Sequence, residues 1–295
     1  MPGSIPAILL SILQKLEPNS AFSASGARIT SSSGTSYYGK IGKPSESEQY
    51  HGEAENLRAM YDAAPGLCPN LFAHGISGDG KPYTLSEYKI LSGLSSAAAV
   101  TLARRLASEL HASGSPNGKF GYQCPTYCGA TRVENGWHDS WDACFGAMIG
   151  GLLDKLERKG NNTALCKLGR DVQSHAIPYL LGEHLKAQPV LLHGDLWSGN
   201  AGTENGEPII FDPAGYYGHN EADLAIARMF GGFPSEFYEE YHRHRPKSHP
   251  EAEYDVRASL YELFHYLNHT VLFGSGYAGG ATQRMTQVLK FLDNK

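Results

Sequence analysis

Two apolar runs that each end at polar residues constrain this chain of 295 residues more than any other feature. The first run, residues 189–192, continues into the segment HGDLWSGN, which places Asp195 and Asn200 five residues apart. The second run, residues 208–211, leads directly into Asp212. We expect the two strand ends to present these three side chains to one cleft. Carboxylate and amide oxygens are hard ligands that suit Mg²⁺, so the pattern predicts a magnesium site there.

The spacing of these residues is typical of phosphoryl transfer. His193, Asp195 and Asn200, followed by a strand and a second acid, match the kinase catalytic signature, and Gly194 stands where protein kinases carry arginine. The reaction needs a base for the acceptor hydroxyl and ligands for the metal that bridges the phosphates of ATP. We interpret Asp195 as the base and Asn200 with Asp212 as the metal ligands. Each residue alone would be interpreted as a turn former or strand cap, but together they indicate catalysis.

A kinase also needs a strand lysine that reaches the α- and β-phosphates, and a helical glutamate that holds this lysine. Lys40 follows a short run suited to a strand, and Glu53 lies thirteen residues later in a charged, helix-favouring segment. These two residues are our candidates for nucleotide binding, with Lys43 and Glu55 as the alternatives. A solvated surface lysine is the ordinary interpretation, and only the downstream pattern favours a functional one.

The first part of the chain is predicted to form a small antiparallel sheet. Residues 20–39 are rich in Ser, Gly, Ala and Thr, a composition suited to twisted strands joined by tight turns. A charged helix is predicted over residues 46–62 and a further strand over residues 82–85. Small side chains at Ser25 and Gly26 permit a close backbone approach, so we expect this turn to cover the phosphates of the nucleotide.

The later part of the chain is predicted to be mainly helical. Leucines recur every fourth residue over 102–110, and apolar residues step by three or four over 256–271, which predicts helices packed on a core. The fold class is therefore α+β. We expect a small sheet lobe over residues 1–86, a hinge over 87–92 and a larger helical lobe over 93–295.

Composition excludes several classes of protein. A formal net charge of −5 gives no broad basic surface, so we expect no nucleic-acid partner. No apolar run approaches the roughly 20 residues of a membrane span, so we expect no membrane partner. The five scattered cysteines argue against a secreted disulfide framework, and a reducing cytoplasm is the predicted location.

Longer stretches of the chain resemble the fructosamine kinase family, the ketosamine 3-kinases that phosphorylate glycated amines. The segments HGDLWSGN at 193–200 and MFGGFP at 229–234 carry the resemblance. HGD alone would mark only a broad class that also contains aminoglycoside and choline kinases. Further matches are DPA at 212–214, YGH at 217–219 and WHDSW at 137–141.

The resemblance implies a protein-kinase-like bilobal fold with ATP between the lobes and Asp195 as the proton acceptor. It also implies hinge contacts to the nucleotide near Glu87, Tyr88 and Lys89. The implied substrate is a ribulosamine or fructosamine on a glycated protein or a small amine, phosphorylated at the sugar 3-hydroxyl. The 3-phosphate then eliminates and releases the amine, so the family is regarded as a protein deglycation system. Another small-molecule kinase of the aminoglycoside or choline class remains the alternative.

Trp197 is our candidate for substrate contact. It lies two residues past the proposed base, and an aromatic face suits a sugar or a cationic amine. Packing of this side chain in the core is the alternative.

Overall fold

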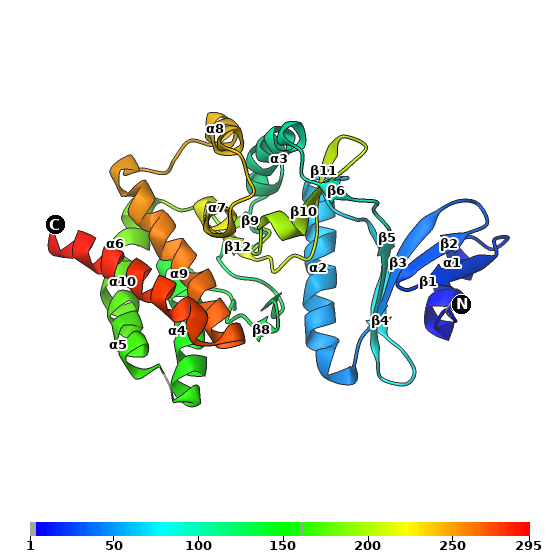
Figure 1. Ribbon diagram of the computed structural model, residues 1–295, viewed down its shortest axis with the longest axis horizontal. Helices are drawn as coiled ribbons and strands as arrows, with labels where there is room; N and C mark the ends of the chain where they lie inside the picture. The colour runs from blue at the N-terminus through cyan, green and yellow to red at the C-terminus, as the bar shows by residue number, and fades with distance from the viewer. Residues whose placement is uncertain (1–3, 161) are drawn as a thin grey trace.

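The computed structural model describes residues 4–160 and 162–295, and it divides into a sheet part and a helical part. Figure 1 shows the sheet with the N-terminal helix at one end of the molecule and most helices at the other, with the two termini at opposite ends. The predicted α+β architecture is confirmed.

The described residues form the following helices and strands: α1 (Ala7–Leu16), β1 (Phe22–Ser25), β2 (Arg28–Ser31), β3 (Ser36–Ile41), α2 (Ser47–Ala63), β4 (Leu71–Ile76), β5 (Pro82–Glu87), β6 (Ser92–Gly93), α3 (Ser96–Ser108), β7 (Tyr127–Cys128), β8 (Thr131–Arg132), α4 (Trp141–Lys159), α5 (Thr163–Asp171), α6 (Ile177–Leu181), β9 (Val190–Leu191), β10 (Ala201–Glu204), β11 (Glu207–Ile210), β12 (Tyr217–Gly218), α7 (Asp223–Phe230), α8 (Ser235–His244), α9 (Tyr254–Phe273) and α10 (Ala278–Asp293). Short 3-10 turns join several of these elements, and residues 172–176 form a π-helical turn between α5 and α6.

The sheet has five antiparallel strands in the order β1-β2-β3-β5-β4. Its small apolar core is formed by α1, which buries Leu9 and Leu13 against Ile29, Tyr37 and Leu85. Helix α2 packs against β4 and β5 and lies between the sheet and the helical part in Figure 1. The predicted helix at 46–62 and strand at 82–85 are therefore confirmed.

The helical part is built around α9, which is buried along most of its length. Trp141 and Phe145 of α4 pack against Tyr261 of α9, and the indole Nε1 of Trp141 donates a hydrogen bond of 3.0 Å to the Tyr261 hydroxyl. The apolar spacing over 256–271 thus predicted α9 correctly. Two short sheets, β9 with β12 and β10 with β11 and β6, hold the two polar segments that follow the apolar runs.

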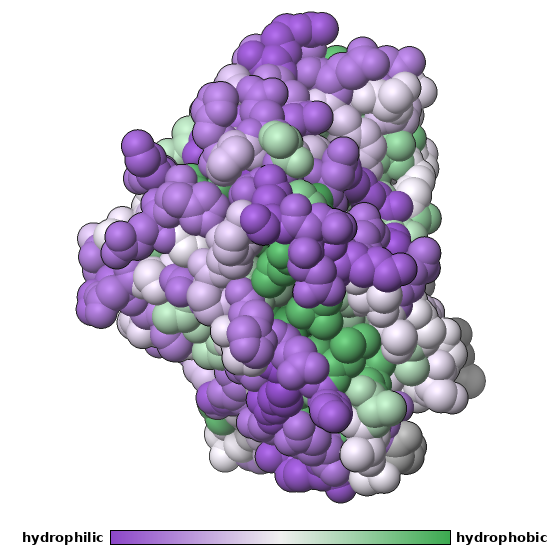
Figure 2. All heavy atoms as spheres, turned by 90° about the vertical axis from the view of Figure 1, so that its left-hand side faces the viewer, coloured by the Kyte–Doolittle hydropathy of each residue, from purple (hydrophilic) through white to green (hydrophobic). Residues whose placement is uncertain are grey.

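The surface of the helical part is largely hydrophilic. Figure 2 shows this face with one strip of hydrophobic side chains running between polar areas. Within the described part of the chain, every helix is too short or too polar to cross a membrane.

Candidate active site

The segment after β9 is fixed by the side chain of His193, which is fully buried. Its Nδ1 accepts a 3.2 Å hydrogen bond from the backbone N–H of Asp195, so Nε2 carries the proton that it donates to the carbonyl of Phe211 at 3.0 Å. Gly194 has φ +79°, and a Cβ there would lie 2.2 Å from the carbonyl oxygen of Ala214. A side chain such as arginine would therefore be excluded at position 194 in this backbone.

Asp223, which was not among the predicted site residues, also fixes this segment through hydrogen bonds. Its carboxylate lies at the start of α7 and accepts hydrogen bonds of 2.7 Å from the backbone N–H groups of His193 and Gly194. His111 approaches the same carboxylate at 3.1 Å. Burial acts to raise the pKa of Asp223, but the His111 hydrogen bond and nearby charge outweigh it and the pKa is lowered. Asp223 lies 29 residues beyond Gly194, which it binds, so no local sequence pattern connects the two residues.

Asn200 orients Asp195. The side-chain amide Nδ2 of Asn200 donates to the backbone oxygen of Asp195 at 3.0 Å and to its carboxylate Oδ2 at 3.2 Å. Burial raises the pKa of Asp195 to about 6, while hydrogen bonds from Cys128 and Asn200 act to lower it. The carboxylate is therefore a stronger base than an exposed aspartate, yet it remains mainly ionised at neutral pH.

Asp212 follows β11 with a left-handed backbone, φ +54°. Non-glycine residues adopt this conformation at a cost, and it turns the chain sharply after the strand. The Phe211 N–H donates to the carbonyl of Asn200 at 3.1 Å, and the Ala214 N–H donates to the carbonyl of His193 at 2.9 Å. The two predicted polar segments are thus joined by hydrogen bonds on both sides of Asp212.

The donor set of this region fits Mg²⁺. Because Nδ2 of Asn200 is occupied by Asp195, its Oδ1 is the atom left to bind a cation. Asp212 is exposed, and no hydrogen bond or ion pair of its carboxylate occurs within residues 4–160 and 162–295. Both groups offer hard oxygen atoms of the kind that magnesium binds.

Lys40 of β3 and Glu53 of α2 form an ion pair, with Nζ of the lysine 3.0 Å from Oε2 of the glutamate. Burial acts to lower the pKa of Lys40, but the Glu53 carboxylate outweighs it and the pKa is raised, so the lysine is charged. Lys43 lies instead at the start of a short 3-10 turn, where its backbone N–H donates to Glu46. Glu55 points away from Lys40 and pairs with Arg58 at 3.0 Å.

One cavity, of about 270 Å³, lies between the sheet and the helical part. Glu53, Glu87, Tyr88, Lys89 and Asp212 line it, together with apolar side chains that include Leu57 and Phe211. Lys89 is held by Glu87 at 2.6 Å and by Glu204 of β10 at 3.2 Å, which ties the predicted hinge to the helical part.

The predicted phosphate-covering turn joins β1 to β2. Ser25 is the last residue of β1 and pairs with Arg28, and Gly26 forms the turn to β2 with φ +61°. Neither residue lines the cavity.

A second cavity, of about 390 Å³, is lined in part by Asp195. Cys128, Asn268 and Asp195 supply its polar groups. Its remaining wall is mainly aromatic: besides Gly129, Ile226 and Leu272, it contains Trp197, Phe230, His269, Phe273 and Tyr277. Asp212 lines the first cavity and Asp195 the second, and the charge of Asp212 acts to raise the pKa of Asp195.

Trp197 belongs to this aromatic wall. Its side chain is 37% exposed, and its ring centroid lies 5.8 Å from that of Phe230. A Cβ on Gly199 would lie 2.2 Å from the indole, so the glycine lets the ring fold back over its own loop. The exposure argues against core packing as the role of Trp197.

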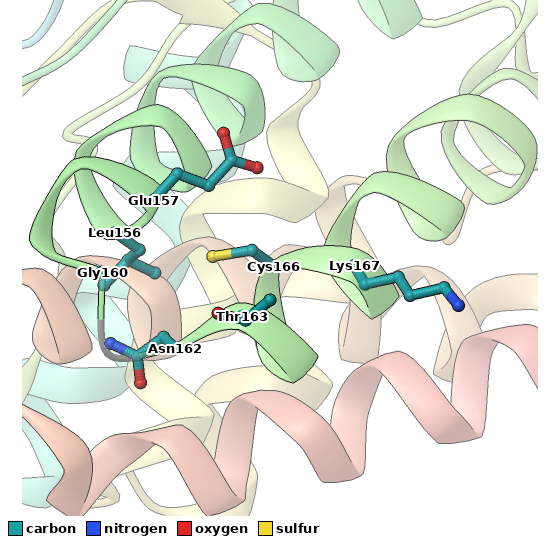
Figure 3. Close-up of a pocket in the computed structure, with 7 residues that line it drawn as sticks. All are labelled: Leu156, Glu157, Gly160, Asn162, Thr163, Cys166 and Lys167. Carbon is teal, nitrogen blue, oxygen red and sulfur yellow. The ribbon is translucent and has the colours of Figure 1, made fainter.

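A further cavity, of about 330 Å³, lies at the corner between α4 and α5, away from these residues. Figure 3 shows its lining, with Cys166 and Thr163 from α5 facing Leu156 and Glu157 from α4. None of the predicted site residues lines it.

A sheet part and a helical part with an Asp–Asn–Asp set between two cavities define a phosphotransferase of the protein-kinase-like class. The sequence model of the fructosamine kinase family matches residues 13–291, and the chain belongs to this family.

Relatives and solved structures agree with that assignment. The chain is 37% identical over 259 residues to a chloroplastic protein-ribulosamine 3-kinase of Arabidopsis thaliana, covering 87% of this chain and 77% of the relative. It is 42% identical over 173 residues to the ketosamine-3-kinase of Mus musculus, covering 58% and 54% of the two chains.

Structural comparison extends the likeness to the fold as a whole. The crystal structure of a putative fructosamine-3-kinase from Thermobifida fusca has a TM-score of 0.80 at 22% identity, covering 97% of this chain and all of the other. An aminoglycoside phosphotransferase in a ternary complex with AMP-PNP and hygromycin B has a TM-score of 0.57 at 16% identity, covering 97% and 98%. The protein-kinase-like fold is thus confirmed.

Proposed function

We propose that this protein transfers the γ-phosphoryl group of ATP to the sugar 3-hydroxyl of ketosamines, either ribulosamines or fructosamines, on glycated proteins or small amines. The product 3-phosphate eliminates and frees the amine, so the reaction leads to deglycation. The observation that carries the proposal is the position of Asp195, a half-buried carboxylate with a raised pKa at the edge of a cavity with an aromatic wall. Phe273 at this cavity is 67% exposed, so a bulky remainder of the acceptor can stay outside.

In this proposal ATP binds in the cavity lined by Glu53 and Asp212, and the ketosamine binds in the cavity lined by Asp195. Asp195 accepts the proton of the 3-hydroxyl while that oxygen bonds to the γ-phosphorus and the bond to ADP breaks. A base with a raised pKa suits this step, because its basicity is closer to the working pH. Lys40, held by Glu53, contacts the phosphates, and residues 87–89 contact the base of the nucleotide.

Asn200 and Asp212 are the proposed ligands of Mg²⁺, which when bound would supply positive charge beside the phosphates of ATP. We place the reaction in the cytoplasm, and the five free cysteines support a reducing compartment.

The acceptor class is tested by measuring ADP release with ribulosamine, fructosamine, choline and an aminoglycoside. We expect turnover with one or both ketosamines and none with the other two compounds. Turnover of choline or the aminoglycoside, with both ketosamines inert, would contradict the proposed acceptor while leaving phosphoryl transfer intact.

Trp197→Ala is expected to raise the KM for the ketosamine about tenfold, corresponding to about 1.4 kcal/mol of lost stacking, with little change in the KM for ATP. Tyr179→Ala removes a comparably exposed aromatic ring, 41% against 37%, from α6 and serves as the control. Steady-state kinetics with each substrate varied in turn would measure the effect. Equal changes in both KM values would argue against stacking on the sugar.

Lys40→Met is expected to lower kcat/KM for ATP about ten- to hundredfold, because a charge-assisted hydrogen bond to the phosphates is lost. Lys43→Met removes the same charge three residues away, at a residue that makes two hydrogen bonds in the described chain, both through its backbone. We expect Lys43→Met to leave kcat/KM nearly unchanged. A larger effect at Lys43 than at Lys40 would reverse the assignment.

The rate is expected to fall as the pH decreases through about 6, since Asp195 has a pKa of about 6 and loses its base function when protonated. The profile of log kcat/KM for the ketosamine against pH, at saturating MgATP, measures this limb. Removing the thiol that lowers this pKa, in Cys128→Ala, is expected to move the limb to higher pH. If kcat/KM decreases at the same pH in the wild type and in Cys128→Ala, the decrease results from titration of a group other than Asp195.

A further inference from the structure

A cluster of two histidines and a glutamate lies where α2 meets β4, and none of its residues lines either cavity of the active site. His51 and Glu55 are one helical turn apart on α2, and His74 faces them from β4. The ligand atoms of the three side chains all lie within 4.8 Å of one another. The imidazole rings are stacked with centroids 5.7 Å apart, and Nε2 of His74 lies 3.5 Å from Oε1 of Glu55.

We propose that His51, Glu55 and His74 form a binding site for a transition-metal dication of the zinc class, with water completing the coordination. Two imidazoles and one carboxylate are a known ligand set for Zn²⁺ that leaves a fourth position open. Ligands about 2.0–2.1 Å from a tetrahedral zinc ion lie about 3.4 Å from one another. The 3.5 Å separation of the His74 nitrogen and the Glu55 oxygen already matches this value.

The surroundings of the cluster favour a ligating state. The side chains of His74 and Glu55 are only 16% and 20% exposed, so both ligands are partly shielded from solvent. Gln123 donates a 3.1 Å hydrogen bond to Oε2 of Glu55 and leaves Oε1 facing His74. Arg58 contacts the same Oε1 at 3.0 Å, but its side chain is 48% exposed and is free to turn away.

A cation at this position would connect α2 to β4. Glu53, which holds Lys40, lies two residues before Glu55 on the same helix and faces the other side. The site would therefore restrain the helix that carries the partner of Lys40. Binding of the metal can be measured without any kinase assay, so failure of this inference is distinguishable from failure of the proposed function.

Titration of chelator-treated protein with Co²⁺, in the presence of excess Mg²⁺, tests the site. We expect one equivalent of Co²⁺ to give visible d–d absorption without a thiolate-to-cobalt charge-transfer band, and Zn²⁺ to displace it. His51→Ala and His74→Ala are each expected to weaken binding at least about tenfold. His244→Ala is the matched control and should bind as the wild type does, because His244 pairs with Glu240 at 2.9 Å one turn away on α8 and belongs to none of the three-ligand groups in the described chain.

Three results would overturn the inference. The first is no binding of Co²⁺ or Zn²⁺, and the second is unchanged affinity in both histidine variants. The third is a thiolate charge-transfer band, which would assign the metal to the other group of ligands in the described residues, Cys128, Asp195 and His265. Because His51 is exposed, His51→Ala is expected to fold normally, and its thermal unfolding curve checks this.

Discussion

Asp195→Asn is expected to lower kcat about 10²- to 10⁴-fold, because the variant keeps the size of the side chain but loses the group that accepts the hydroxyl proton. The amide oxygen can still accept the hydrogen bond from Asn200, so the loop retains its main contact. MgATP binding, measured by calorimetry, should change little, since Asp195 lines the other cavity. The drop is measured as ADP release at saturating concentrations of both substrates.

The same substitution is expected to stabilise the protein. A carboxyl whose pKa rises from 3.8 to about 6 on folding opposes folding at pH 7, when it is ionised. The cost is fully present above the folded pKa and disappears as the pH falls below 3.8. A rise of about 2 in pKa corresponds to about 3 kcal/mol, which is the upper limit of the gain in unfolding free energy.

Denaturant unfolding of wild type and Asp195→Asn at pH 7 and pH 4 measures this gain, which should be largest at pH 7. A variant that is inactive but less stable at pH 7 would mean that the carboxylate is stabilised by contacts that outweigh its burial. A variant that keeps more than a tenth of the wild-type kcat would remove Asp195 from the role of base.

The fold and the family could be predicted from sequence because their signals are local. The helical spacing of apolar residues in α9 and the turn-forming composition of residues 20–39 can each be recognised from residues that are close in the sequence. The segments at 193–200 and 229–234 carry the family resemblance in continuous text. The ion pair of Lys40 with Glu53 forms in the structure because a strand residue and a helix residue thirteen positions apart face each other.

Other parts of the site depend on contacts between distant segments, which a single sequence does not display. The aromatic wall joins Trp197 to Phe230, His269, Phe273 and Tyr277 from α7, α9 and the turn after α9. Ser25 and Gly26 lie at the turn between β1 and β2, and their contact with the phosphates stays a prediction.

Asp223 is the clearest case of a residue whose importance appears only in the structure. Its carboxylate is fully buried and accepts hydrogen bonds from two backbone N–H groups of the loop that carries Asp195. His111, which also contacts the hydroxyl of Tyr241, reaches the same carboxylate. Since Asp223 lines neither cavity, we describe it as a positioning residue that acts through the loop.

Asp223→Asn is expected to lower the unfolding free energy by about 3 kcal/mol or more. One carboxylate oxygen becomes an NH₂ group that faces a backbone N–H of His193 or Gly194, so a hydrogen bond to a charged acceptor is lost and a buried donor is left unpaired. The loop should shift, and a displacement of about 1 Å at the reacting groups can lower kcat about a hundredfold. Denaturant unfolding and steady-state kinetics, at a temperature where the variant is folded, measure the two effects.

Asp255→Asn is the matched control, because its side chain lies in the first turn of α9 and is 90% exposed. The same change of atoms there should alter stability by no more than about 0.5 kcal/mol. If Asp223 positions the catalytic loop, its variant should lose kcat while the KM for ATP stays near the wild-type value, since the nucleotide cavity is lined by other segments. A variant with normal kcat but low stability would show that the carboxylate supports only the fold, because the loop would then keep its geometry without the two hydrogen bonds.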